Sequence, residues 1–322
     1  MHLKTKILKN NKKNVVFAAK LLKKNKIVGI PTETVYGLAG RADNDVAIKK
    51  IFKIKNRPLF NPLILHYKSS DFALNDIFFD DRAKELAKKF WPGALTIVSK
   101  IKSKYISRFA TAHLDTVAVR VPSNNSIRNL LMQLEFPLAA PSANRYGKIS
   151  PTSAKDVYNE LNNKIPLILD GGQSSVGVES TIVDLTDTKV LILRHGYISS
   201  SAIGKVLNCS IDKLNYAKVF KSPGLSLNHY QPDKPVRINA KKQNKNEGWL
   251  AFGKVPNNSF NPSLSLSKKK CLKEAAKNLY KMLRQLDSKQ IRGIAVQKIP
   301  QKGLGVAIND RLYKASKKEN EK

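Results

Sequence analysis

Residues 31–38 read PTETVYGL, and residues 55–66 read KNRPLFNPLILH. An apolar segment at 27–30 precedes the first stretch, and a run with helical spacing leads into the second. Strand-like and helical patterns alternate in this way to about residue 200, which predicts an α/β or α+β domain with one large, twisted, mixed sheet and flanking helices. Hydroxyls and cations lie where these elements end, which is typical of a site for a small polar molecule beside phosphates.

Hydrophobic periodicity predicts the individual elements. In the first part of the chain, the patterns predict helices at 15–22, 47–54 and 83–90 and strands at 26–30, 95–99, 116–121, 137–140, 165–169, 180–185 and 189–194. In the second part, they predict strands at 235–238, 248–252, 262–266 and 292–297 and helices at 268–287 and 306–316. We therefore expect a first domain at 1–203, a linker at 204–235 and a smaller Rossmann-like α/β domain at 236–322.

Composition limits the class of protein. The chain has 322 residues and is 42% hydrophobic, enough for two globular domains with their own cores. The start lacks the apolar centre of a secretory signal, and no apolar run approaches membrane-spanning length, so a cytoplasmic protein without a membrane partner is expected. Cys209 and Cys271 form no CxxC pair, which argues against a disulfide framework or a cysteine zinc site.

The charge balance is strongly basic, with 58 Lys and Arg against 24 Asp and Glu and a net charge of +34. Such a surface attracts polyanions, and weak RNA contact is one interpretation. The lysines nevertheless occur in scattered short runs interleaved with asparagine, as an A/T-rich coding sequence would produce. Both explanations stay open, and they are compatible with each other.

The segment TVAVRVP at 116–122 places one arginine on an apolar strand. Because strand side chains alternate, Val117, Val119 and Val121 share one face, and Thr116, Ala118 and Arg120 share the other. A buried guanidinium needs a partner, so Arg120 is expected to face a cleft that holds an anion. A salt bridge to a structural carboxylate is the alternative.

Further polar groups follow later strands. The loop after 137–140 carries Ser142 and Asn144 among small residues that let a ligand approach the backbone. Ser150 before Pro151 has the form of a helix N-cap, which could receive a phosphate or serve only as a cap. Ser180 opens one strand and Arg194 closes another, and although each could be structural, open sheets place ligands beyond strand ends.

Several common chemistries lack their motifs. The chain contains no GxxxxGK[ST], GxGxxG, GxSxG or HExxH sequence, and no pair of histidines has metal-ligand spacing. His66 ends the KNRPLFNPLILH segment, where it is either a site residue or a core histidine. The candidate site is thus cationic and rich in hydroxyls, which favours binding and orienting anionic reactants.

Taken together, these motifs resemble a known family. PTETVYGL, the KxR pair Lys55/Arg57, WPGALT at 91–96, AVRVP at 118–122, the SxN pair Ser142/Asn144 and ESTIVD at 179–184 resemble the YrdC-like domain in order and spacing. SPGLSLNHYQP at 222–232 is similar to the linker of the long, two-domain threonylcarbamoyl-AMP synthases. The hydrogenase-maturation carbamoyltransferases share the domain but carry an acylphosphatase module and cysteine-rich motifs that this sequence lacks. Ala39, where the family commonly has glycine, and the Lys/Asn-rich stretch 239–247 depart from the pattern.

The resemblance implies a nucleotidyltransferase. L-threonine, bicarbonate and ATP would give pyrophosphate and threonylcarbamoyl-AMP, which a downstream transferase machinery uses to modify tRNA. Mg²⁺ is expected with ATP, with no identified protein ligands, and no organic cofactor is expected.

The resemblance also implies site residues. The catalytic pair would be Lys55 and Arg57. L-threonine would be contacted by Thr34, His66, Arg120, Ala140 and Ser180. ATP would be contacted by Lys55, Arg57, Asn61, Thr116, Ser142, Asn144, Ser150, Arg194 and Tyr230, where the linker folds over the cleft; a linker tyrosine packed between domains is the alternative for Tyr230. A noncatalytic RNA-binding protein of the same fold is the alternative function.

Overall fold

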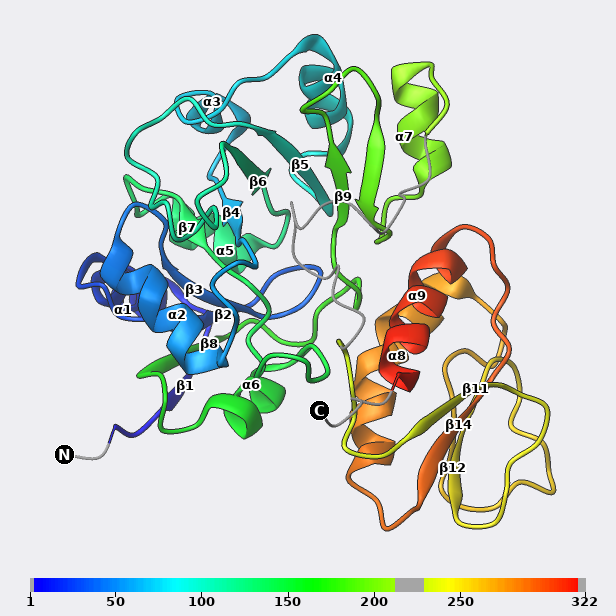
Figure 1. Ribbon diagram of the computed structural model, residues 1–322. Helices are drawn as coiled ribbons and strands as arrows, with labels where there is room; N and C mark the ends of the chain where they lie inside the picture. The colour runs from blue at the N-terminus through cyan, green and yellow to red at the C-terminus, as the bar shows by residue number, and fades with distance from the viewer. Residues whose placement is uncertain (1–2, 212–228, 318–322) are drawn as a thin grey trace. The chain divides into compact units, whose positions relative to one another are not determined.

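The computed structural model describes residues 3–211 and 229–317, which divide into two compact units (Figure 1). The first unit contains most of the chain up to residue 211, and the second contains 229–317 together with the short segments 147–150 and 175–178. The predicted domain limits at 203, 235 and 236 stay a prediction. Most of the linker motif at 222–232 lies outside the described residues.

The described part of the first unit forms a ten-stranded mixed sheet in the order β1-β8-β2-β3-β7-β4-β6-β5-β9-β10. The strands are β1 (Lys6–Lys9), β2 (Val28–Ile30), β3 (Gly37–Arg41), β4 (Ile64–His66), β5 (Leu95–Lys100), β6 (Thr116–Arg120), β7 (Leu138–Ala139), β8 (Leu167–Asp170), β9 (Thr181–Asp184) and β10 (Leu191–Arg194). Parallel and antiparallel pairs alternate irregularly along it, and the predicted fold class is confirmed.

The helices of this unit cover the two faces of the sheet unequally. They are α1 (Lys12–Lys23), α2 (Asp45–Lys55), α3 (Ser70–Ala73), α4 (Asp81–Phe90), α5 (Asn125–Leu131), α6 (Ala154–Leu161) and α7 (Ser200–Leu207). One core cluster combines buried residues of α2, α4, α6 and α7 with strand residues such as Val119 and Leu65. A second combines α1 and α5 with β2, β7 and β8. The helical patterns at 15–22, 47–54 and 83–90 are thus confirmed as α1, α2 and α4.

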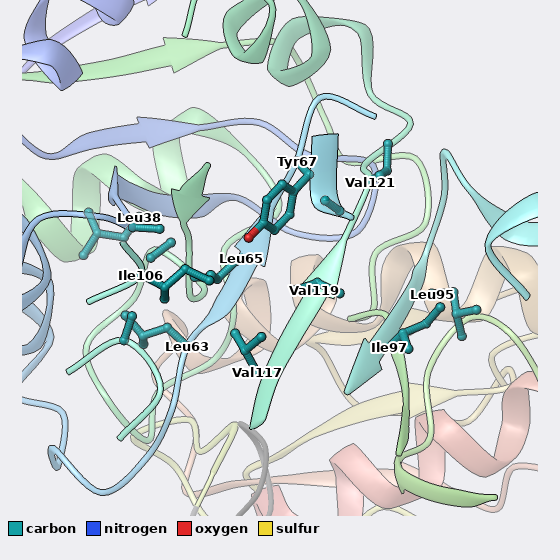
Figure 2. Packing of buried hydrophobic residues seen from close by; sticks show 14 of the residues in the cluster. Leu38, Leu63, Leu65, Tyr67, Leu95, Ile97, Ile106, Val117, Val119 and Val121 are labelled. Carbon is teal, nitrogen blue, oxygen red and sulfur yellow. The ribbon is translucent and has the colours of Figure 1, made fainter. Parts of the chain in front are cut away.

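Strand alternation decides what each face of β6 presents. Val117, Val119 and Val121 lie in the main core beside Leu95 and Ile97 of β5, as Figure 2 shows. On the opposite face, the apolar cluster over β4, β5, β6, β9 and β10 contains only strand residues and no residue of a described helix. The same face also carries His66 and Arg120, because each lies two positions from a member of this cluster.

Some elements differ from the sequence predictions. Three of the five residues of β3 are glycine or alanine, which have weak strand preference, and the strand forms because it pairs with β2 on one side and β7 on the other. The predicted helix start at Ser150-Pro151 is wrong: α6 begins at Ala154, with Ser153 as N-cap in a capping box with Asp156. Ser150 is fully buried and belongs to the second unit.

The second unit has a four-stranded parallel sheet in the order β11-β14-β12-β13. Its strands are β11 (Val236–Ala240), β12 (Glu247–Ala251), β13 (Ser263–Ser265) and β14 (Gly293–Gln297), and its helices are α8 (Leu272–Asp287) and α9 (Leu304–Ser316). The two helices pack against each other and against the strands, in agreement with the predicted small α/β domain (Figure 1). Among the described residues of the chain, no helix is long and apolar enough to cross a membrane.

Candidate functional site

The pairing register of β4 and β6 brings the predicted polar residues onto one face of the sheet. His66 of β4 pairs with Arg120 of β6, two positions from the pair Ile64 and Ala118. The side chains of His66 and Arg120 therefore share the face opposite the main core. Thr116 lies on the same face at the other end of β6, about 13 Å along the strand from Arg120.

Arg120 is buried and makes three side-chain contacts within the first unit. Its Nη2 forms a salt bridge with the Glu33 carboxylate, its Nη1 donates to Thr34 Oγ1 at 3.0 Å, and its Nε donates to the Gly93 carbonyl at 3.2 Å. The salt bridge to a carboxylate, kept open from the sequence, is therefore present. An anion-binding role for Arg120 stays a prediction.

Glu33 is only 5% exposed. Burial by itself would raise the pKa of its carboxyl, but the Arg120 charge and neighbouring backbone N–H groups outweigh it, so the pKa lies below the usual value. The Glu33 carboxyl therefore stays ionised in its salt bridge with Arg120. Thr34 is also fixed there, since its Oγ1 lies 2.9 Å from Thr32 Oγ1.

His66 is buried next to this ion pair. Burial and the positive charge of Arg120 lower its pKa from 6.5 to about 3, so the imidazole is neutral at physiological pH. Its Nδ1 has no hydrogen-bond partner among the described residues. A neutral imidazole in this position can accept or donate a hydrogen bond without adding charge.

A second cluster lies at the start of β9. Ser180 Oγ is 2.7 Å from Thr96 Oγ1, while Arg194 donates from Nη2 to Ser180 Oγ and from Nε to the Ser180 carbonyl, both at 3.1 Å. The WPGALT stretch joins this cluster to Arg120, because Gly93 accepts from Arg120 and the Ala94 carbonyl accepts from Thr181 N at 3.1 Å. The predicted strand-end residues Ser180 and Arg194 are therefore in contact.

The KxR pair lies at the end of α2. Lys55 is its last residue and Asn56 is a left-handed C-cap with φ 53°, so Arg57 lies just beyond the helix. Lys55 Nζ donates to the carbonyls of Ser142 and Asn144 at 2.5 and 2.6 Å. Burial, followed by the charge of Arg57, lowers the pKa of Lys55 well below its usual value, and Glu160 partly offsets this.

Arg57 fixes the segment that follows it. Its Nη2 donates to Asn61 Oδ1 at 2.5 Å and to the Pro62 carbonyl at 2.9 Å, and its Nε donates to the Asn61 carbonyl at 3.0 Å. The Tyr146 ring lies 5.8 Å from the guanidinium, and its hydroxyl accepts from Asn61 Nδ2 at 3.4 Å. The two cations of the motif thus bind backbone and amide oxygens of their own unit.

The loop after β7 connects the clusters. Ala140 N donates to the Ile64 carbonyl at 3.1 Å, and Ser142 pairs with Gly37 across an isolated bridge. A Cβ at Gly37 would lie 3.2 Å from the Ala140 Cβ, so glycine permits this close approach. PTETVYGL therefore joins the Arg120 contacts at its start to the Ser142 loop at its end.

Two predicted nucleotide residues, Ser150 and Tyr230, belong to the second unit. Tyr230 has a positive φ of 65° and is 1% exposed. Its ring stacks on Tyr280 with centroids 5.7 Å apart, and the Arg311 guanidinium lies 5.3 Å from it. Tyr230 thus contacts side chains of its own unit, and its nucleotide contact stays a prediction.

Three residues of the clusters were not predicted. Glu33 stood unassigned inside PTETVYGL, although a carboxylate beside an expected anion-binding arginine is a signal. Thr96 has the strand parity of the polar face, which alternation along 95–99 could have revealed. Tyr146 has no local signal, because its contact with Asn61 depends on a partner 85 positions away.

The described residues offer no cluster of three or more His, Cys, Asp or Glu side chains that could hold a metal ion. The Lys55 and Arg57 contacts supply cations, amides and carbonyls rather than the paired carboxylates that a dedicated Mg²⁺ site uses. This donor set does not fit a resident metal.

Known proteins of one family match this chain over nearly its whole length. A family model described as "Telomere recombination" matches residues 20–196, and one described as "Threonylcarbamoyl-AMP synthase, C-terminal domain" matches residues 198–317. Proteins named threonylcarbamoyl-AMP synthase from Pyrococcus abyssi and Bacillus subtilis are 38% and 37% identical, covering 93% and 96% of this chain and 93% and 94% of their own lengths. The crystal structure of P. abyssi Sua5 complexed with L-threonine superposes with a TM-score of 0.88 at 35% identity, covering 97% of each chain.

Proposed function

The chain belongs to the threonylcarbamoyl-AMP synthase family, and from that membership we infer that it is an enzyme that makes threonylcarbamoyl-AMP. We propose that L-threonine, bicarbonate and ATP are its substrates and that pyrophosphate is the second product, which makes it a nucleotidyltransferase. The observation that carries the proposal is the full-length likeness to a structure that holds L-threonine.

The chemistry requires two bond-forming steps. The threonine amine condenses with bicarbonate to a carbamate, with loss of water. A carbamate oxygen then attacks the α-phosphorus of ATP and expels pyrophosphate, so several negative charges must be held close together. A cationic, hydroxyl-rich face meets this requirement by positioning and charge stabilisation.

We assign threonine to the polar face of β4, β6 and β9. Arg120 would bind the substrate carboxylate as a fork, with Glu33 and Thr34 setting the guanidinium plane. His66, which is neutral because of its low pKa, and Ser180 would contact the remaining polar groups of threonine, with Ala140 lining the backbone side.

We assign ATP to the Lys55 side. Arg57, Asn61, Ser142, Asn144, Thr116 and Arg194 would line it from the first unit, and Ser150 and Tyr230 belong to the second. Mg²⁺ would arrive as part of the ATP complex, bound mainly by phosphate oxygens, since the described residues supply no carboxylate set for it.

The product is an activated acyl donor, so its consumer must be a group transferase. We propose the machinery that threonylcarbamoylates tRNA for this step, and the cytoplasm as the place of reaction. Weak RNA contact through the +34 surface is compatible with this function.

The deciding experiment is pyrophosphate release from ATP by the full chain, with L-threonine and bicarbonate both present and each omitted in turn. We expect release only when both are present, together with a product of the mass of threonylcarbamoyl-AMP. No release combined with tight tRNA binding would favour the noncatalytic RNA-binding alternative.

A further inference from the structure

Lys55 occupies a position where its helix calls for an apolar side chain. The buried residues of α2 include Ile48, Ile51 and Phe52, and Lys55 follows them at helical spacing on the same face. Only 1% of Lys55 is exposed. A cation at such a position must find oxygen partners inside the protein.

Those partners are backbone carbonyls of a single loop. Lys55 Nζ donates to the carbonyls of Ser142 and Asn144, and the Lys55 carbonyl accepts from Tyr146 N at 2.8 Å. One residue therefore makes three hydrogen bonds to residues 142–146. Glu160, whose negative charge acts on Lys55, forms a salt bridge with Arg145.

The loop is held from its other side by different groups. Ala143 N donates to the Tyr36 carbonyl at 2.8 Å, and Ser142 pairs with Gly37. Tyr146, at the end of the loop, contacts Arg57 and Asn61. Moving the loop would therefore move Ser142 and Tyr146 relative to Arg57 and Asn61.

We propose that Lys55 is a positioning residue, which holds the 142–146 loop through its backbone and so shapes the nucleotide side of the site, rather than a residue that touches a phosphate. This proposal rests on the assignment of ATP to that side. Arg57 and Asn61 keep their proposed direct contacts.

The test compares Lys55→Met with Lys53→Met, a control that removes an exposed lysine two positions earlier in the same helix. Amide hydrogen exchange is followed at Ala143 and Tyr146, and the affinities of AMP and ATP are measured by calorimetry. If Lys55→Met melts too low to study, Lys55→Gln is measured in the same way.

We expect Lys55→Met to speed exchange at Ala143 and Tyr146 by about tenfold or more and to weaken AMP and ATP by the same factor, with Lys53→Met like the wild type. Unchanged exchange, or a loss for ATP that clearly exceeds the loss for AMP, would overturn the positioning role in favour of phosphate contact. The exchange measurement needs no turnover, so it is separate from the pyrophosphate assay that tests the proposed function.

Discussion

At the scale of single residues, the site depends on buried charges with closely fitted partners. Arg120 is paired with Glu33, Arg57 with Asn61 and Pro62, and Lys55 with two carbonyls. Removing one partner of such a pair leaves the other group buried and unsatisfied. Substitutions here should therefore affect local order and chemistry together.

Replacing Arg57 with alanine removes a cation from the proposed phosphate region and frees three acceptor positions on Asn61 and Pro62. We expect pyrophosphate release to fall by at least about 100-fold, with a stability loss of about 1–3 kcal/mol. Steady-state assays and urea unfolding measure the two effects, with Lys53→Ala as the control. Unchanged turnover in Arg57→Ala would contradict the site assignment.

His66 predicts a pH dependence of stability. Its folded pKa of about 3 lies below its ordinary value of 6.5, so the unfolded chain binds the proton more readily. The contribution is complete above pH 6.5 and is lost as the pH falls from 6.5 towards 3, at up to about 1.4 kcal/mol per pH unit.

Urea unfolding at pH 7, 6 and 5 checks this contribution by comparing the wild type with His66→Gln, which cannot titrate. The wild type should lose about 2 kcal/mol more than the variant between pH 7 and 5. Parallel curves would show that His66 is not held in its neutral form by the fold.

At the scale of elements, strand parity creates the site. The valines of β6 lie in the main core, and Arg120 lies on the opposite face of the strand. The side chains of β4, β5 and β9 alternate between the same two faces. Caps define where the helices begin, and the N-cap of α6 is Ser153 rather than Ser150. Residues 151 and 152 therefore precede the helix, and Thr152 N donates to the Asp156 carboxylate at 2.9 Å.

Ser153→Ala tests this helix boundary. The Ser153 side chain accepts from Asp156 N at 3.2 Å, so its removal should destabilise the protein by about 1 kcal/mol. Chemical denaturation measures the difference, with the exposed Ser175→Ala as a control that should be neutral. Equal stability of the two variants would refute the cap.

At the scale of the whole molecule, the positive charge is spread well beyond the site clusters. Residues 268–270 are exposed lysines, as are Lys241, Lys242 and Lys245 in the second unit. They belong to the second unit, whereas the residues assigned to threonine and most of those assigned to ATP belong to the first. The synthase function and the RNA-binding alternative therefore make opposite predictions for these lysines.

Replacing these six lysines with glutamine should leave pyrophosphate release within about twofold of the wild type, because they hold no substrate. The same change should weaken tRNA binding and reduce its salt dependence, since phosphate contacts scale with positive charge. Loss of function in cells with intact pyrophosphate release would support the RNA-binding alternative.

The sequence by itself determined the order of most helices and strands, the split between the faces of β6 and the family. These are properties of local periodicity and short motifs, which act over a few residues. It also singled out His66, Arg120, Ser180 and Arg194 as candidate site residues on or beside strands. The sequence patterns did not predict weak strands such as β3, because pairing with neighbouring strands rather than intrinsic preference stabilises them.

Only the tertiary structure decided which partners the buried charges take. Arg120 and Thr34 are 86 positions apart in the chain, and Lys55 and Asn144 are 89 apart. No local pattern encodes such pairs, because they form only when strands and loops that are far apart in the sequence come together in the folded sheet. The sequence was therefore enough to predict which cations belong to the site. Only the fold determined that Lys55 binds the carbonyls of the 142–146 loop and that Arg120 binds the Glu33 carboxylate.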